Sequence, residues 1–298
     1  MTKDKINCSL GIIVYNEAQN ISGLLDSVLS QDFEKVNLEE IIVVSSASKD
    51  GTDEIVKEYE KKNPKIKLIS EKERNGKSSA INIFIKNAKT DILIIESGDT
   101  IPGQDTIEKI VIPFENEKIG MTGGRPIPIN STKNLVGFSV NLLWKLHHKM
   151  ALINPKLGEM IAFRRCFEKI PVESAVDEAS IEAEIKAHNL QKKYIPNAII
   201  INKGPENVSD FLLQRRRISA GHYWLMKTKN YKVTSLNPAI LFKITIDEII
   251  SRPASIHKIF FTMMLEIIGR ILGWYDYNVK KKNPFKWEIA TSTKNLKK

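Results

Sequence analysis

Several features that would assign this chain of 298 residues to a familiar class are scarce or missing. Its two cysteines, Cys8 and Cys166, are too few for a disulfide framework and lack metal-site spacing, so a reducing compartment is expected. No apolar run approaches the ~20 residues of a membrane-spanning helix. The first run, around 10–14, is too short for a signal peptide. We therefore expect a protein that is neither secreted nor threaded through a bilayer.

Two common nucleotide-binding motifs are also missing. Gly76, Lys77 and Ser78 resemble the end of a phosphate-binding loop, but that loop requires a glycine where this chain has Glu71. No Gly-x-Gly-x-x-Gly follows the first apolar run. The P-loop nucleoside triphosphatases and the dinucleotide-dependent oxidoreductases are excluded on these grounds.

Positive charge is in excess, with a formal net charge of +10. Residues 279–298 hold seven lysines and one glutamate, and a second basic run covers 215–217. Such runs suit phosphates, nucleic acid or an anionic membrane surface, and a solvated tail is the alternative for 294–298. Since no stripe of interleaved basic and aromatic residues is present, we expect no nucleic-acid partner. A basic nucleic-acid-binding protein stays an alternative suggested by charge alone.

The first hundred residues alternate short apolar runs with segments of helical periodicity. Strands are predicted at 8–14, 41–44, 66–69 and 91–95, and helices at 21–29, 55–59 and 78–88. Asn20 is the expected N-cap of the first helix. This order predicts an α/β fold with a mostly parallel, doubly wound sheet. Because ligands bind beyond the carboxyl ends of such strands, the polar residues that follow them are the first candidates for a site.

The second half is less regular. Helices are predicted at 135–150 and 181–188, and a strand at 194–201. Residues 256–272 are apolar but are interrupted by charged side chains, which is typical of an amphipathic helix in a membrane interface. Packing of that helix on the remaining protein is the alternative. We predict two parts, a main domain at 1–235 and a helical, basic, membrane-associated segment at 236–298.

Seven segments resemble, in order and spacing, the motifs of the family 2 glycosyltransferases, which are inverting enzymes of GT-A fold. They are GIIVYNEAQNI at 11–21, VVSSASKDGTDEI at 43–55, NGKSSAIN at 75–82, ESGDTIP at 96–102, GEMIAFRR at 158–165, DEASIEAEI at 177–185 and QRRRI at 214–218. Together the motifs cover about residues 8–225. The resemblance implies a GT-A-like fold and transfer of a sugar from a nucleotide-sugar donor, with a uridine diphosphate sugar expected. A lipid-linked or polysaccharide acceptor is implied as well.

The resemblance also implies which side chains bind the donor. The matched and neighbouring positions are Tyr15, Asn16, Glu17, Ser45, Asp50, Arg74, Lys77, Gln214 and Arg217. Among them, Gln214 and Arg217 are expected to clamp the diphosphate, because a guanidinium binds phosphate oxygens with two parallel hydrogen bonds. His222, one helical turn past Ile218, is a further candidate for contact with metal or phosphate, with a structural role as the alternative.

A divalent cation, Mg²⁺ or Mn²⁺, is the implied cofactor, since a Lewis acid neutralises the departing diphosphate. Ser97 replaces the first aspartate of the Asp-x-Asp motif, which leaves Asp99 as the implied metal carboxylate. Hard cations take oxygen ligands, so one carboxylate with phosphate oxygens and water is sufficient. A turn or helix cap before Pro102 is the structural alternative for Asp99.

The acceptor hydroxyl needs a general base within hydrogen-bond reach. Asp177 and Glu178 match the family's acidic pair, and we favour Asp177, with Glu178 as the alternative base and helix capping as the structural alternative. With its basic C-terminal part, the enzyme is expected at the cytoplasmic side of the cell membrane, as a peripheral protein on an anionic surface. The departures at Ser45 and Ser97 leave open a catalytically degenerate scaffold of the same fold.

Overall fold

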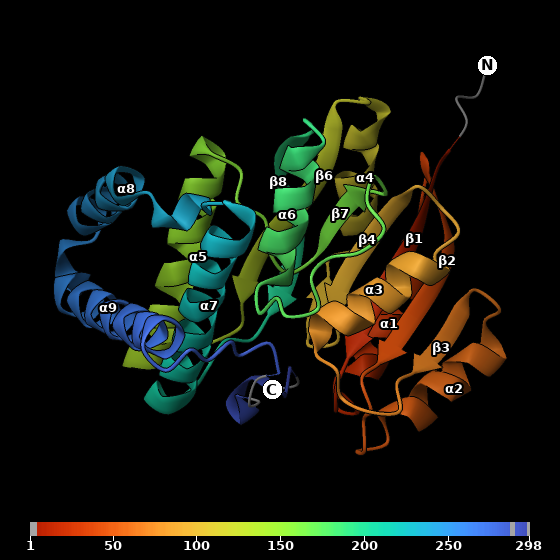
Figure 1. Ribbon diagram of the computed structural model, residues 1–298, viewed down its shortest axis with the longest axis horizontal. Coiled ribbons are helices and arrows are strands. Elements are labelled where there is room, and N and C mark those ends of the chain that lie inside the picture. The colour runs from red at the N-terminus through yellow and green to blue at the C-terminus, as the bar shows by residue number, and fades with distance from the viewer. Residues whose placement is uncertain (1–4, 287–289, 297–298) are drawn as a thin grey trace.

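The structure is a computed structural model that describes residues 5–286 and 290–296 (Figure 1). Eight strands form one sheet in the order β3-β2-β1-β4-β7-β6-β8-β5. The strands are β1 (Ile6–Val14), β2 (Val36–Ser45), β3 (Ile66–Ser70), β4 (Ile92–Ser97), β5 (Thr100–Pro102), β6 (Ile119–Pro128), β7 (Ile161–Arg164) and β8 (Gln191–Asn202). The helices are α1 (Ile21–Leu29), α2 (Thr52–Lys62), α3 (Lys77–Asn87), α4 (Thr106–Val111), α5 (Leu135–Ile153), α6 (Asp177–Ala187), α7 (Val208–Lys229), α8 (Pro238–Ser251) and α9 (Ile256–Asn278).

The four N-terminal strands are parallel, as the alternation of apolar runs and helices predicts. β1 pairs with β2 and β4, and β2 pairs with β3, all in parallel. The second half of the sheet is mixed, because β7 is antiparallel to both β4 and β6, and β5 is antiparallel to β8. The α/β fold class is confirmed, and the parallel character belongs mainly to the first half.

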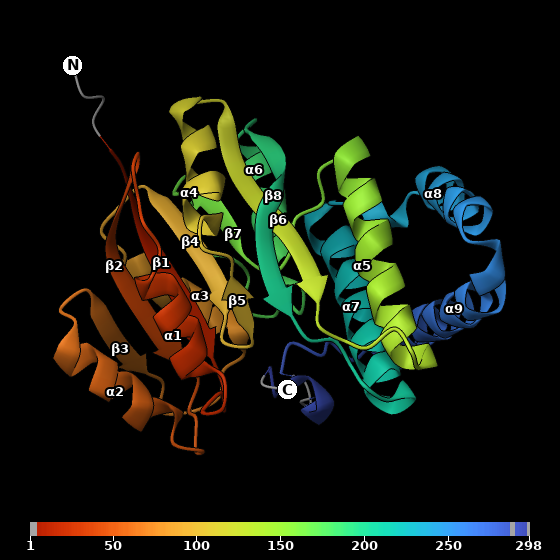
Figure 2. The same ribbon diagram turned by 180° about the vertical axis from the view of Figure 1, so that it is seen from behind.

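Helices cover both faces of the sheet. Apolar residues of α1 and α4 pack with β1 and β2 into one core, and residues of α3 and α6 pack on the opposite face into a second core. Figure 2 shows α1 and α4 in front of the sheet, whereas α3 and α6 lie in front of it in Figure 1. The predicted helix at 21–29 is confirmed. Asn20 stands at its N-cap position, but its side chain donates to Glu17 instead of capping the helix.

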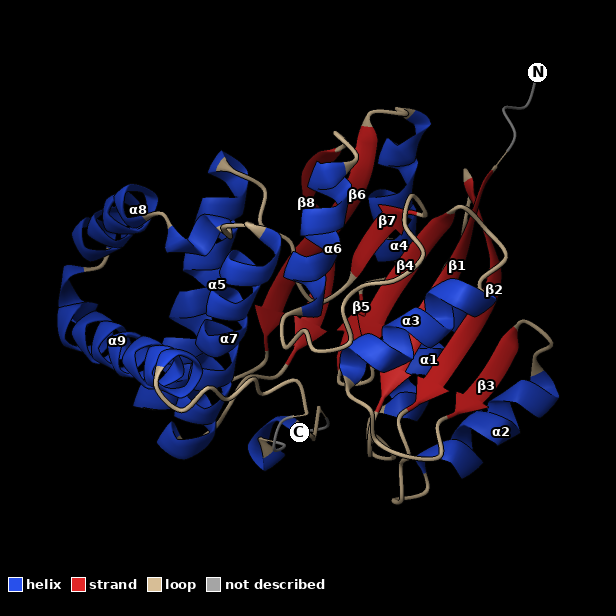
Figure 3. Ribbon diagram, viewed as in Figure 1, coloured by secondary structure: helices blue, strands red, loops and turns tan. Residues whose placement is uncertain are grey.

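Helices α5, α7, α8 and α9 form a separate layer beside the sheet, in which they pack on one another (Figure 3). α9 contacts α7 and α5, so it does pack on the remaining protein along one face. Its other face is exposed and apolar, with Phe260 72% and Ile271 59% exposed. Among the described residues, no helix combines the length and the apolar character needed to cross a bilayer.

The described C-terminal segment, residues 290–296, returns to the sheet half of the molecule. The Leu296 amide donates to Asn20 Oδ1 over 3.1 Å, and the Ser292 amide donates to Asp210 Oδ2 over 3.1 Å. These bonds join the first loop of the sheet to the start of α7. Of the basic tail predicted from the sequence, Glu288, Lys297 and Lys298 lie outside the described residues.

Candidate active site

A cavity of about 1000 Å³ opens at the carboxyl ends of β1 and β4, between the sheet and the helical layer. Nine of the twelve site residues predicted from the sequence line it: Tyr15, Glu17, Arg74, Lys77, Asp99, Asp177, Glu178, Gln214 and Arg217. The first and the last of them, Tyr15 and Arg217, are 202 positions apart in the chain. The fold therefore gathers side chains from both the donor-side and the acceptor-side motifs around one space.

Asp99 follows β4 and lies in a group of carboxylates. Burial, followed by the charge of Asp99, raises the pKa of Glu17 to about 7 and that of Glu159 to about 7. Burial also raises the pKa of Glu96 to about 8; this side chain accepts a hydrogen bond from Thr100, and its Oε2 has no partner among the described residues. Such a concentration of negative charge is what a divalent cation would relieve.

The described residues do not form a complete metal cage. In residues 5–286 and 290–296, no three His, Cys, Asp or Glu side chains are grouped so as to hold a metal ion by themselves. This fits a cation that a single aspartate holds together with phosphate oxygens of a ligand. Gly98 lets the Asp99 loop approach β1, because a Cβ at this position would lie 2.7 Å from Val14 Cγ1.

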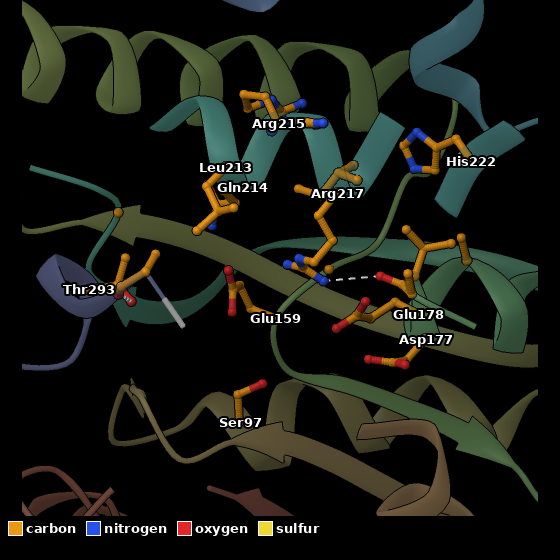
Figure 4. Close-up of a pocket in the computed structure, with 18 of the residues that line it drawn as sticks. Ser97, Glu159, Asp177, Glu178, Leu213, Gln214, Arg215, Arg217, His222 and Thr293 are labelled. Carbon is orange, nitrogen blue, oxygen red and sulfur yellow. Dashed lines mark hydrogen bonds between the residues drawn. The ribbon is translucent and has the colours of Figure 1, made fainter. Parts of the chain in front are cut away.

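Asp177 and Glu178 occupy the first turn of α6 and point into the cavity beneath Arg217 (Figure 4). Ser78 Oγ donates to Asp177 Oδ1 over 2.7 Å. Lys77 Nζ lies 3.4 Å from Asp177 Oδ2 and 3.1 Å from Glu178 Oε1. The start of α3 thus supplies a cation and a hydroxyl donor that hold the two carboxylates in place.

The two neighbouring carboxylates differ in acidity. Burial raises the pKa of Asp177 above its usual value, and Lys77 only partly offsets that effect. Burial acts on Glu178 in the same sense, but the Lys77 charge and hydrogen bonds to Glu178 outweigh it, so its pKa is lowered. The same carboxylates hold the pKa of Lys77 above its usual value although burial opposes them. At neutral pH, Asp177 is therefore the stronger proton acceptor of the pair.

The three arginines of α7 point in different directions, as expected for consecutive helix residues. Arg215 forms a two-bond pair with Glu266 of α9 (2.7 and 3.2 Å), and Arg216 pairs with Asp276 of α9. Arg217 extends toward Asp177 and Glu178, and its Nη1 donates to the Ala175 carbonyl over 3.0 Å (Figure 4). Two of the three arginines therefore bind α9 to α7, and Arg217 is the one directed toward the carboxylates.

The loop after β1 forms the other wall of the cavity. The Arg74 guanidinium lies 4.3 Å from the centroid of the Tyr15 ring, within range of a cation–π contact. Glu17 is buried and pairs with Lys294 of the C-terminal segment, whose Nζ also donates to the Tyr15 carbonyl over 3.1 Å. The C-terminal segment thus places a lysine on the predicted donor side.

Three predicted donor-side residues, Asn16, Ser45 and Asp50, do not line the cavity. Ser45 is fully buried and donates to Ser48 Oγ over 2.9 Å. Asn16 Oδ1 accepts the Lys49 amide, and Asp50 accepts the amides of Ala18 and Thr52. Asn16 and Asp50 therefore join the loops after β1 and β2, and Ser45 supports the second of these loops from within.

Some cavity residues were not identified from the sequence. Glu159 belongs to the GEMIAFRR segment and lines the cavity. Apart from that match, nothing in the sequence indicated it as a site residue. Lys156 lies in a loop without periodicity, and Lys294 lies in a tail whose composition indicates only positive charge. His222, which was identified as a candidate, also lines the cavity, and burial lowers its pKa well below the usual range.

The fold and the site together define a class: an α/β protein with an acidic loop after β4 and a carboxylate–lysine–arginine group facing it across one cavity. The sequence profile of glycosyl transferase family 2 matches residues 9–174, more than half of the chain. The chain belongs to glycosyl transferase family 2.

Curated relatives support this membership. Glycosyltransferase AglE of Haloferax volcanii is 34% identical over 116 residues, which are 39% of this chain and 38% of that protein. The poly-beta-1,6-N-acetyl-D-glucosamine synthase of Staphylococcus epidermidis is 23% identical over 273 residues, which are 87% of this chain and 65% of that protein. The chain thus spans between 38% and 65% of the length of these two relatives.

Solved structures share the fold. The mannosyltransferase PcManGT from Pyrobaculum calidifontis, in complex with GDP-Man and Mn²⁺, superposes with a TM-score of 0.61 at 18% identity, covering 95% of this chain and 82% of that one. TarS of S. aureus in complex with UDP-GlcNAc superposes with a TM-score of 0.52 at 16% identity, covering 92% of each chain. The GT-A-like architecture predicted from the motifs is confirmed.

Proposed function

We propose that the protein transfers a sugar from a nucleotide-sugar donor to an acceptor hydroxyl, with inversion at the anomeric carbon. The observation that carries this proposal is the single cavity lined by Asp99 on one wall and by Asp177, Glu178 and Arg217 on the other. A diphosphate leaving group needs cations, and a hydroxyl nucleophile needs a base. The lining of this cavity offers candidates for both requirements: Arg217 and a cation held by Asp99 for the diphosphate, and Asp177 or Glu178 for the base.

In this mechanism, Asp99 would hold Mg²⁺ or Mn²⁺, which supplies Lewis-acid chemistry at the diphosphate. Mn²⁺ is present with GDP-Man in the PcManGT complex, and with uridine diphosphate in a complex of glucosyl-3-phosphoglycerate synthase from Mycobacterium tuberculosis. Gln214 and Arg217 face the same space and would bind the diphosphate. The proposed donor side is completed by Tyr15, Glu17, Arg74 and Lys77. The loops after β1 and β2, which carry part of this side, are held in shape by Asn16, Ser45 and Asp50.

Asp177 is the proposed base. It lies in the same cavity as the proposed metal residue, it has a raised pKa, and Ser78 fixes its orientation. Glu178 holds Lys77 in place and is the alternative base. A uridine diphosphate sugar is the proposed donor, by likeness to TarS bound to UDP-GlcNAc, and a guanosine diphosphate sugar is the second candidate, by likeness to PcManGT bound to GDP-Man.

The proposed acceptor is lipid-linked or a polysaccharide, and the proposed location is the cytoplasmic face of a membrane. Support for the location comes from α8 and α9, which lie at the end of the molecule away from the sheet (Figures 1 and 2). Exposed apolar side chains gather on this pair of helices: Phe242, Ile246, Ile250, Phe260, Ile267, Ile271 and Trp274. Exposed cations lie on the same two helices and just beyond them, at Lys243, Arg252 and Lys280–Lys282. This combination suits an anionic bilayer surface.

A thermal-shift screen followed by a transfer assay tests the proposed activity. Purified full-length protein is heated with UDP-glucose, UDP-GlcNAc or GDP-mannose, each with and without Mn²⁺. The accepted donor should raise the melting temperature and should do so more strongly with Mn²⁺, because only a ligand of the native state stabilises it. The accepted donor is then used in a transfer assay. A donor that binds but is neither transferred nor hydrolysed would favour the degenerate scaffold, and salt-dependent retention on DNA without any donor effect would favour the nucleic-acid binder.

A further inference from the structure

Glu159 lies inside the cavity, and the proposed mechanism gives it no role. It belongs to the loop that precedes β7 and is only partly exposed. Figure 4 shows its carboxylate between Ser97 of β4 and Arg217 of α7, with Glu178 to one side. A charged side chain at this position contacts whatever ligand fills the middle of the cavity.

The backbone at Glu159 is in a conformation that glutamate rarely adopts. Its φ of 59° falls in the left-handed region, where glycine and asparagine are the common residues. Strained residues of this kind persist where the surrounding structure enforces them, and they concentrate at active sites and ligand-binding loops. The backbone therefore marks Glu159 as a candidate functional residue independently of its charge.

Asn202 at the end of β8 holds the Glu159 side chain. Its Nδ2 donates to Glu159 Oε1 over 3.1 Å. The side-chain amide has no second bond, since Asn202 Oδ1 is buried without a partner among the described residues. Glu159 Oε2 accepts no hydrogen bond from residues 5–286 and 290–296, and it is open to the cavity instead of being enclosed. One oxygen of the carboxylate is thus fixed, and the other is available to a ligand.

No cation of the described chain contacts the Glu159 carboxylate directly. Lys77 is the cation whose charge favours the ionised form of Glu159. The Lys77 Nζ, however, lies 3.1 Å from Glu178 Oε1 and 3.4 Å from Asp177 Oδ2. Among the residues that the structure describes, Glu159 forms no ion pair. When it is ionised, this carboxylate therefore adds negative charge to the middle of the cavity.

The electrostatic neighbours of Glu159 lie on both sides of the proposed reaction. The charges of Asp99 and Glu178 both act on Glu159. The charge of Glu159 acts in turn on Arg217. In the proposed transfer, Asp99 and Arg217 are on the side of the diphosphate, and the acidic pair faces the acceptor hydroxyl. The sugar passes from one to the other, so it occupies the space between them, where Glu159 lies.

We propose that Glu159 selects the transferred sugar: its free oxygen accepts a hydrogen bond from a sugar hydroxyl, and its charge excludes donors whose sugar carries a carboxylate. This inference rests on the proposed glycosyl transfer and gives the donor a narrower class, a neutral sugar and not a uronic acid. A hydroxyl group supplies the hydrogen-bond donor that Oε2 lacks. The carboxylate of a uronic acid brings only acceptors and a second negative charge into a partly enclosed space, where like charges repel strongly.

The binding of two donors that differ in one group tests the proposal. Affinities of the full-length protein for UDP-glucose and UDP-glucuronic acid are measured by calorimetry with Mn²⁺ at about pH 8, because the pKa of Glu159 is raised to about 7. UDP-glucose should bind at least about 10-fold more tightly, since contacts between like charges are costly. Glu159→Gln keeps the shape but removes the charge, so it should strengthen the binding of UDP-glucuronic acid and reduce the difference to less than about 3-fold.

Equal binding of the two donors by the wild type, or an unchanged difference in Glu159→Gln, would overturn the proposal. GDP-mannose and GDP-mannuronic acid replace the two donors if the thermal-shift screen selects GDP-mannose. The expected change is a gain of affinity, which misfolding does not produce, so the variant is informative even if its melting temperature falls.

Two controls separate this role from others. Glu117→Gln removes an exposed carboxylate outside the cavity and should leave both affinities unchanged. UDP lacks the sugar, so Glu159→Gln should bind it as the wild type does. A change in UDP affinity as large as that for UDP-glucuronic acid would assign Glu159 to the cation or the diphosphate and overturn the proposal. If the wild type binds neither UDP nor any sugar nucleotide, the proposed function itself is contradicted, and the selection of a sugar fails with it.

Discussion

Asp99 is the residue on which the proposed chemistry depends most. Replacing it by asparagine removes the charge that would hold the cation but keeps the size of the side chain. Since a bound metal supplies several kcal/mol of transition-state stabilisation, turnover of Asp99→Asn should fall at least about 100-fold in a transfer assay with the accepted donor. The melting temperature without ligand should not fall.

Asp32→Asn provides a matched control, because Asp32 is an exposed aspartate away from the cavity. It should keep full turnover. Wild-type turnover by Asp99→Asn would exclude the metal role, and an unfolded Asp99→Asn would assign the residue to structure instead.

The acidic pair predicts a particular pH dependence. Asp177 has a raised pKa and acts as a base only when it is deprotonated, so kcat/KM should fall as the pH falls through that raised value. Asp177→Asn should reduce kcat by about 10²- to 10⁴-fold. Glu178→Gln should keep the acidic limb of the profile, because Glu178 has a lowered pKa and pairs with Lys77. If Glu178→Gln removes the limb instead, Glu178 is the base.

At the residue scale, sequence reasoning identified side chains whose type and position follow a strand or begin a helix. Asp99, Asp177 and Lys77 are of this kind, and the fold brings them to one cavity. Lys156 and His147 carried no such signal, because they line the cavity only together with α7 and α9, which are distant in the chain. Hydrophobic periodicity indicates which face of a helix or strand is apolar. It does not indicate which distant elements pack against each other.

At the scale of elements, α9 shows how an amphipathic pattern can be read in two ways. The sequence predicted a helix with one apolar and one charged face, and a helix is present. The face directed toward the protein holds Gly269, Gly273, Glu266 and Asp276, whereas large apolar side chains point outward. The two acids lie on the inward face because Arg215 and Arg216 of α7 pair with them. The same face also buries Ile259 and Leu265.

The close approach of α9 to α7 depends on the two glycines of α9. A Cβ at Gly273 would lie 2.5 Å from the Arg216 carbonyl oxygen and 2.6 Å from Ser219 Cβ. Gly273→Val should therefore force the helices apart and lower the free energy of unfolding by about 1–3 kcal/mol, as overpacking does. Thermal and urea unfolding measure this loss. Ile271→Val, on the exposed face, is the control and should change the stability little. Equal stability of both variants would contradict the close packing of α9 on α7.

At the scale of the whole molecule, the parallel first half of the sheet was predictable, because buried parallel strands appear as continuous apolar runs. The mixed second half was not predicted, since β7 spans only Ile161–Arg164 and is antiparallel to β4 and β6. The course of the C-terminal segment was not predicted from the sequence either. Its bonds to Asn20 and Asp210 join parts of the chain that no local pattern relates.

The outward apolar face of α8 and α9 leads to a prediction about the molecule as a whole. If this face lies on an anionic bilayer, charges introduced into it should release the protein without unfolding it, because the substituted side chains are exposed and make few internal contacts. The double variant Phe260→Glu/Ile271→Glu should lose most of its sedimentation with vesicles of phosphatidylglycerol and phosphatidylcholine. Its melting temperature should stay close to that of the wild type.

The matched control places the same two charges on exposed apolar residues elsewhere. Leu29 and Val172 are 40% and 44% exposed and lie outside α8 and α9. Leu29→Glu/Val172→Glu changes the net charge equally and should still sediment with the vesicles, since the apolar face and its flanking cations are intact. If both double variants are released to the same extent, net charge alone governs binding. If neither is released, the face of α8 and α9 does not contact the membrane.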